Sequence, residues 1–117
     1  MLKVLNQLAI MFKVSPNDII EMNGRKEELV AARRFYVYYL NKHKNIPHNQ
    51  IKKYIKGMCH ATSIYHCRKL EDYFKIYEDV KVEYIEMLYQ ADEAEFYNLR
   101  NNIIFKDVMK NILTIIK

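Results

Sequence analysis

The chain has 117 residues, a formal net charge of +5, and apolar or aromatic side chains at half of its positions. That content is enough for one folded domain and excludes a disordered chain. Two glycines and two prolines are too few for the turns of a β-sandwich or barrel. No apolar run reaches the roughly 20 residues of a membrane span, and the N-terminus lacks a signal peptide's apolar segment. Two cysteines make no disulfide framework. We therefore predict an all-α, soluble, intracellular protein.

Helix signals occupy the first 43 residues. Apolar residues at helical spacing predict a helix over residues 2–12. Ser15-Pro16, a cap followed by a proline at the first helical position, predicts a short helix over residues 16–22 that Gly24 ends. Further apolar residues at helical spacing predict a long helix over residues 27–43.

The second half of the chain continues the helical pattern. Pro47 separates the long helix from another over residues 47–56, which Gly57 ends. A new helix follows almost at once, and two helices joined around a glycine are typical of a helix-turn-helix unit. Further helices are predicted from Glu78 and over residues 103–116. The apolar residues expected to face inward are Ile64, Cys67, Leu70, Phe74, Val80, Tyr84, Met87 and Leu88.

Charge is distributed unevenly along the chain. Residues 1–71 carry a net charge of +8, whereas residues 72–117 carry −3. A basic segment of this kind favours a polyanionic partner, most simply nucleic acid, although a solvated basic surface is the alternative. The aromatic run Phe35–Tyr39 could stack on bases, but we predict that it packs in the core, because the long helix should be central.

Several motifs in the basic segment occur in the order of a known family. The stretch from Gly57 to Glu71 contains His60, Thr62 and Arg68-Lys69 at the positions of a Gly-Arg-Asp-His-Ser/Thr-Thr-Val signature and of the Arg-Lys-Ile-Glu that follows it. Upstream, residues 28–33 and 9–20 match further family segments. The sequence resembles the DNA-binding domain of the bacterial replication initiator DnaA, a Trp-repressor-like helix-turn-helix domain. The resemblance covers about residues 4–90 and implies a DNA-binding domain over residues 1–90, with a helical extension of unknown role over residues 91–117.

The resemblance implies roles for individual residues. The second helix of the unit would enter the major groove of duplex DNA, and a basic loop would enter the minor groove. Base contacts would come from Arg25, Cys59, His60, Thr62 and Ser63. Phosphate contacts would come from Lys26, Arg33, Arg34, Lys52, Lys53, Lys56, Ala61 and Arg68. His60 as a helix cap and Arg25 as a solvated loop charge are the structural alternatives.

The chain departs from the family in two ways. Cys59 stands where the family has an aspartate that can accept a hydrogen bond from cytosine, and a thiol is a weak acceptor. We therefore expect an altered or relaxed target sequence. The chain also has no nucleotide-binding loop of the Gly-x-x-x-x-Gly-Lys-Ser/Thr type. What the resemblance implies is thus a DNA reader of a bacterial or phage-infected cytoplasm, acting in replication control or transcription regulation without ATP chemistry.

Zinc binding by Cys59, His60, His66 and Cys67 is disfavoured, because adjacent helical residues point apart. No nucleophile, base and orienting group form a visible set, so we predict no enzyme and no cofactor. The main rival is an adaptor that keeps the fold and binds a protein through the helix over residues 103–116. That helix could instead pack on its own domain or form a homodimer, which would place two reading helices on neighbouring half-sites.

Overall fold

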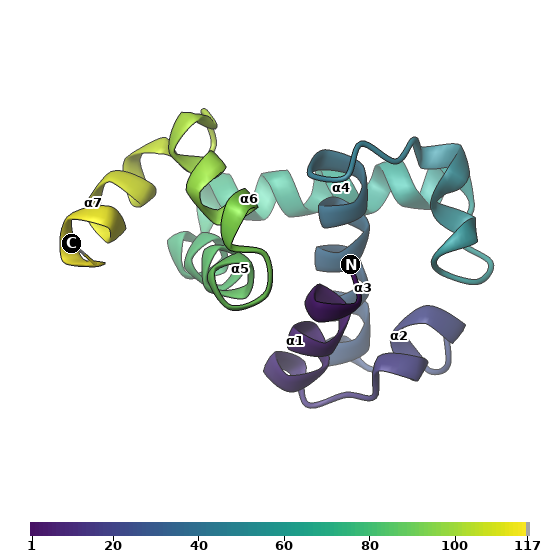
Figure 1. The fold of residues 1–117 in the computed structure, drawn as a ribbon. Coiled ribbons are helices and arrows are strands. Elements are labelled where there is room, and N and C mark those ends of the chain that lie inside the picture. Colours follow the sequence, from purple (N-terminus) through teal and green to yellow (C-terminus); the bar gives the residue numbers. More distant parts are fainter. Residues whose placement is uncertain (117) are drawn as a thin grey trace.

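The computed structural model describes the backbone of residues 1–116 and the side chains of residues 1–115. Within these residues the chain is all-helical and contains no strand, as predicted (Figure 1). No helix in this part of the chain is both long and apolar enough to cross a membrane. The elements in chain order are α1 (Leu2–Phe12), α2 (Pro16–Glu21), α3 (Glu27–Lys42), the 3-10 helix η1 (His48–Lys53), α4 (His60–Ile76), α5 (Glu78–Ala91), α6 (Glu93–Asn98), the 3-10 helix η2 (Leu99–Asn101) and α7 (Lys106–Ile116).

The first two helices begin and end where local chemistry dictates. α1 ends at Lys13, whose left-handed backbone (φ 56°) lets its N–H bond back to the last turn. Ser15 caps α2, because its hydroxyl accepts a hydrogen bond from the Asn17 N–H at 3.2 Å. The predicted short helix is confirmed, but the left-handed residue that ends it is Met22 (φ 59°) rather than Gly24.

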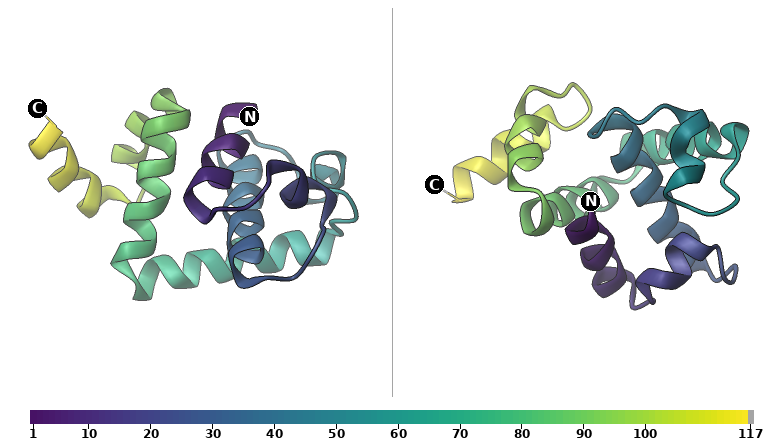
Figure 2. Two further views of the ribbon diagram at one scale, coloured as in Figure 1. Left: turned by 90° about the horizontal axis from the view of Figure 1, so that it is seen from below. Right: turned by 45° about the vertical axis from the view of Figure 1, so that its right-hand side comes forward.

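The long helix α3 is the centre of the fold. It contacts α1, α2, η1 and α4, so its apolar residues are covered on several sides (Figure 2). Every side chain from Phe35 to Leu40 is at most 4% exposed. The prediction that the aromatic run packs in the core is therefore confirmed. Tyr38 meets Phe74 of α4 and Tyr84 of α5 edge-on, at ring-centroid distances of 5.4 and 5.3 Å.

The segment before α4 differs from its prediction. Instead of an α-helix over residues 47–56, a 3-10 helix spans only His48–Lys53. Its hydrogen bonds join residues three apart, as in the 2.8 Å bond from Gln50 N–H to the Pro47 carbonyl. Beyond this 3-10 helix, the Lys56 N–H donates to the Ile20 carbonyl at 2.7 Å. This bond ties the segment to the end of α2, and Ile51 and Ile55 of the same segment are fully buried.

α4 and α5 follow the predicted apolar pattern, although two of its positions are only half-buried. Cys67, Leu70 and Phe74 of α4 are buried, but Ile64 is only half-buried. Tyr84, Met87 and Leu88 of α5 are buried as predicted, and Val80 is half-buried against them.

Residues 91–116 pack against the preceding bundle through both polar and aromatic contacts. The Tyr39 hydroxyl donates to Asp92 at 2.6 Å, and His43 Nδ1 lies 2.9 Å from Glu95. Phe105 inserts its ring 4.9 Å from that of Phe74. The helix predicted over residues 103–116 begins only at Lys106, and α6 and η2 were not predicted. α7 extends at the opposite end of the molecule from η1 (Figure 2).

Candidate nucleic-acid interface

The start of α4 presents a short exposed surface. Cys59 precedes the helix with extended backbone angles, and Cys59, His60 and Ala61 are exposed. Thr62 is half-buried, and its hydroxyl lies 3.0 Å from Cys59 Sγ. This hydrogen bond, together with backbone N–H groups of the first turn, lowers the pKa of the Cys59 thiol. The first turn of α4 can therefore meet a partner through the side chains of Cys59, His60 and Ala61 and the exposed part of Thr62.

Ser63 does not belong to this exposed surface, which corrects the expected base contact. Its side chain is fully buried, and its hydroxyl oxygen lies 2.7 Å from His48 Nδ1. This contact and the complete burial show that Ser63 faces η1 rather than solvent. Its hydroxyl therefore fastens η1 to α4, and a base edge cannot reach it in this arrangement.

His48 is a neighbour of this exposed surface that the sequence did not indicate. Its ring centroid lies 6.0 Å from that of His60. Burial lowers the pKa of His48, and the nearby His60, Lys42 and Arg68 lower it further. No local motif marks His48, because its proximity to His60 arises only from the packing of η1 on α4.

Arg33 is buried and joins backbone segments of its own chain, which corrects the phosphate contact expected for it. The side chain is 4% exposed, and its guanidinium donates to four backbone carbonyls. The acceptors are Ile19 at 3.2 Å, Gly24 at 2.9 Å, Asp18 at 2.8 Å and Asn23 at 3.1 Å. Burial lowers the pKa of Arg33, and Asp18 partly opposes this shift. The guanidinium thus shapes the loop that carries Arg25 instead of facing a ligand.

Arg34 is held at the side of α4 by aromatic and imidazole groups. Its Nε donates to His66 Nδ1 at 3.2 Å, and its guanidinium carbon lies 5.9 Å from the Tyr65 ring centroid and 5.5 Å from that of Tyr73. Burial and the charges of Arg34 and Arg33 lower the pKa of His66 to about 4. His66 is therefore neutral near pH 7, as an acceptor must be. Within the described residues, the terminal nitrogens of Arg34 have no protein partner and remain free to bind an anion.

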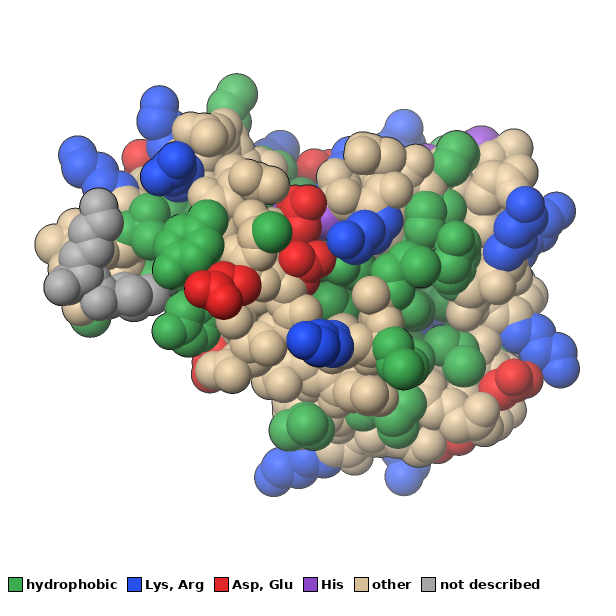
Figure 3. Space-filling model, in the orientation of Figure 1, with side chains coloured by type: hydrophobic (Ala, Val, Ile, Leu, Met, Phe, Trp, Pro, Cys, Tyr) green, Lys and Arg blue, Asp and Glu red, His purple; other side chains and the backbone are tan. Residues whose placement is uncertain are grey.

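The other expected cationic contacts are exposed. This group consists of Arg25, Lys26, Lys52, Lys53, Lys56 and Arg68. Lys56 lies 3.6 Å from Glu21, but its side chain is 76% exposed, so the ion pair does not bury its charge. Figure 3 shows Lys and Arg side chains along the right-hand edge of the molecule, where η1 and α2 lie in Figure 1.

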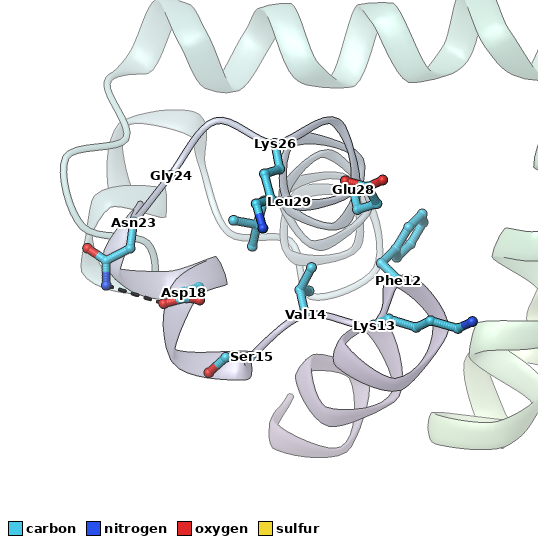
Figure 4. Close-up of a pocket in the computed structure, with 10 residues that line it drawn as sticks. All are labelled: Phe12, Lys13, Val14, Ser15, Asp18, Asn23, Gly24, Lys26, Glu28 and Leu29. Atoms are coloured by element: carbon cyan, nitrogen blue, oxygen red, sulfur yellow. Dashed lines mark hydrogen bonds between the residues drawn. The ribbon is translucent and has the colours of Figure 1, made fainter.

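A pocket lined by both charged and apolar side chains lies beside the loop that Arg33 shapes (Figure 4). Its walls come from the end of α1, from α2 and from the start of α3. Lys13 and Lys26 line it together with Asp18 and Glu28, so its charges are mixed. Asn23 donates to Asp18 at 3.4 Å across one wall. This balance of charge makes the pocket a poor anion site compared with the exposed lysines of η1.

The residues considered as zinc ligands differ in their partners and exposure. His66 Nδ1 accepts from Arg34, and burial raises the pKa of the Cys67 thiol to about 11. Cys59 is exposed. Among the described residues, no three His, Cys, Asp or Glu side chains lie close enough together to hold a metal ion.

Comparison with known proteins gives no relative: no family model, no curated protein and no solved structure matches the chain.

Proposed function

We propose that the protein binds double-stranded DNA in a sequence-specific manner, with the start of α4 in the major groove and the Arg25 loop in the minor groove. The observation that carries this proposal is the exposed first turn of α4, flanked by the exposed lysines of η1. A helix whose N-terminal residues are free and whose neighbouring element is basic suits major-groove docking. The similarity of residues 4–90 to the DnaA DNA-binding domain supports the same orientation.

The proposed arrangement divides the residues by task. Arg25, Cys59, His60 and Thr62 meet base edges, with the Thr62 methyl group suited to a thymine methyl. Phosphates are bound by Lys26, Arg34, Lys52, Lys53, Lys56 and Arg68 and by the backbone N–H of Ala61. Ser63 and Arg33 support this surface from within: Ser63 fixes η1 on α4, and Arg33 fixes the loop before α3.

Such a protein would act by occupying sites. Binding at a replication origin or a promoter would control replication or transcription without chemistry on the DNA. Because Cys59 replaces the family's aspartate, one base contact worth about 1–3 kcal/mol is changed, and the target sequence should differ from the DnaA box at that position.

A protein adaptor is the second candidate. Two expected DNA contacts, Arg33 and Ser63, are buried, so the set of reading residues is smaller than the resemblance implies. An adaptor would keep the helical scaffold and use the apolar surface of its C-terminal helices.

The deciding experiment measures binding to a labelled duplex carrying a DnaA box and to a shuffled duplex, at low and moderate salt. We expect box binding to exceed shuffled binding, with log Kd changing by roughly 0.9 per phosphate contact for each tenfold change in salt. His60→Ala should abolish the preference, whereas the matched control Gln90→Ala, at an exposed position of α5, should not.

Two other outcomes are informative. Equal binding to both duplexes that collapses with salt would support the basic surface and show that the target differs from the DnaA box. A selection from random duplexes would then identify the target. Absence of binding at low salt would refute the DNA proposal and favour the adaptor.

A further inference from the structure

The outer face of α1 carries exposed apolar side chains among basic ones. Leu2 and Ile10 lie two helical turns apart, and each is 71% exposed. Lys3 and Lys13 are exposed near them, and α1 contains no acidic residue. We call the surface formed by Leu2, Lys3, Ile10 and Lys13 the α1 stripe. Large aliphatic side chains this exposed at helical spacing suggest a helix face that lacks a partner.

A second apolar surface, which is a groove, lies between α5, α6 and α7. Its lining is almost entirely apolar and comprises Val82, Ile85, Glu86, Tyr89, Phe96 and Ile112. Val82, Ile85, Glu86 and Tyr89 follow one face of α5, and Val82 and Tyr89 remain 41% and 43% exposed. Figure 3 shows hydrophobic side chains gathered over this end of the molecule with acidic side chains beside them.

The α1 stripe and the groove carry charges of opposite sign. α5 contains four acidic residues and one lysine, and the only charged group in the groove lining is Glu86. An apolar helix face with flanking lysines is therefore the occupant that the groove fits best. The α1 stripe is such a face. It cannot reach the groove of its own chain, because the buried side of α1 packs against α3 and α5.

We propose that the groove binds the α1 stripe of a second copy of this chain. α1 and α5 contact each other, so the stripe and the groove lie on neighbouring elements. A two-fold axis would then let each copy place its stripe in the groove of the other, closing a dimer with two identical contacts. If the proposed DNA binding also holds, each dimer carries two reading helices.

Sedimentation velocity of the full chain, from about 1 µM to about 1 mM, tests this proposal without DNA. We expect a monomer–dimer equilibrium. Ile10→Glu and Tyr89→Glu should each raise the dimer Kd at least about tenfold, and Glu86→Lys, at an exposed position, provides a second groove variant. Ile76→Glu is the matched control, because Ile76 is 69% exposed on α4 and belongs to neither surface.

Mixing the variants distinguishes this dimer from others. The Ile10→Glu chain keeps an intact groove, and the Tyr89→Glu chain keeps an intact stripe, so an equal mixture should dimerise more strongly than either variant alone. A single monomeric species up to about 1 mM would overturn the proposal. Dimers that Ile76→Glu weakens as much as Ile10→Glu does, or a mixture that recovers nothing, would overturn it too. Loss of DNA binding with the dimer intact would refute only the DNA proposal.

Discussion

Replacing Arg33 by methionine should lower the free energy of unfolding, because the guanidinium donates hydrogen bonds to four backbone carbonyls. Each net hydrogen bond contributes about 0.5–1.5 kcal/mol, and bonds from a charged donor contribute more. Three of the four bonds are only partly buried, so water can replace them in the variant. We therefore expect a loss of about 3 kcal/mol in the free energy of unfolding.

Urea unfolding monitored by circular dichroism measures this loss. Arg25→Met is the control, since Arg25 is exposed and its replacement should change stability by less than about 0.5 kcal/mol. Arg33→Lys should recover only part of the loss, because an ammonium cannot reach acceptors spread over a loop and a helix end. The reasoning would be refuted if Arg33→Met kept wild-type stability while lowering DNA affinity and the salt slope by one phosphate contact.

Three further predictions concern titration, the C-terminal helices and the cysteines. The folded state holds His66 neutral, with a pKa of about 4 against 6.5 in the unfolded chain. The neutral imidazole therefore makes its full contribution to the free energy of unfolding above pH 6.5. This contribution, up to about 3 kcal/mol, is lost as the pH falls toward 4. Urea titrations of the wild type and His66→Asn should converge over this range, and parallel curves would contradict the assignment. Tyr39→Phe removes the 2.6 Å bond to Asp92 and should cost about 1–2 kcal/mol, measured by thermal unfolding against Tyr77→Phe, an exposed control. Iodoacetamide followed by peptide mapping should modify Cys59 well before Cys67, whose thiol is buried with a pKa of about 11, and equal labelling of the native protein would be inconsistent with the structure.

The candidate site was only partly predictable. His60 and Ala61 are exposed at the start of a helix, where the motif and Gly57 placed them. Ser63 and Arg33 are buried although they match or adjoin the same motifs. A match to a motif indicates which side chain is present, but its exposure depends on segments that pack against it. For Arg33 those segments lie 9 to 15 residues away in the sequence.

The sequence by itself determined where the first three helices begin and end. Ser15, the apolar spacing of α3 and the break at Pro47 act within one or two helical turns, so local hydrogen bonding and periodicity suffice to predict them. The tertiary structure decided the rest. It made residues 48–53 a short 3-10 helix, bound the Lys56 N–H to the Ile20 carbonyl, and set His48 against Ser63 and Asp92 against Tyr39. These contacts join residues 15 to 53 positions apart, where no local signal reaches, and they arise only when the helices pack together.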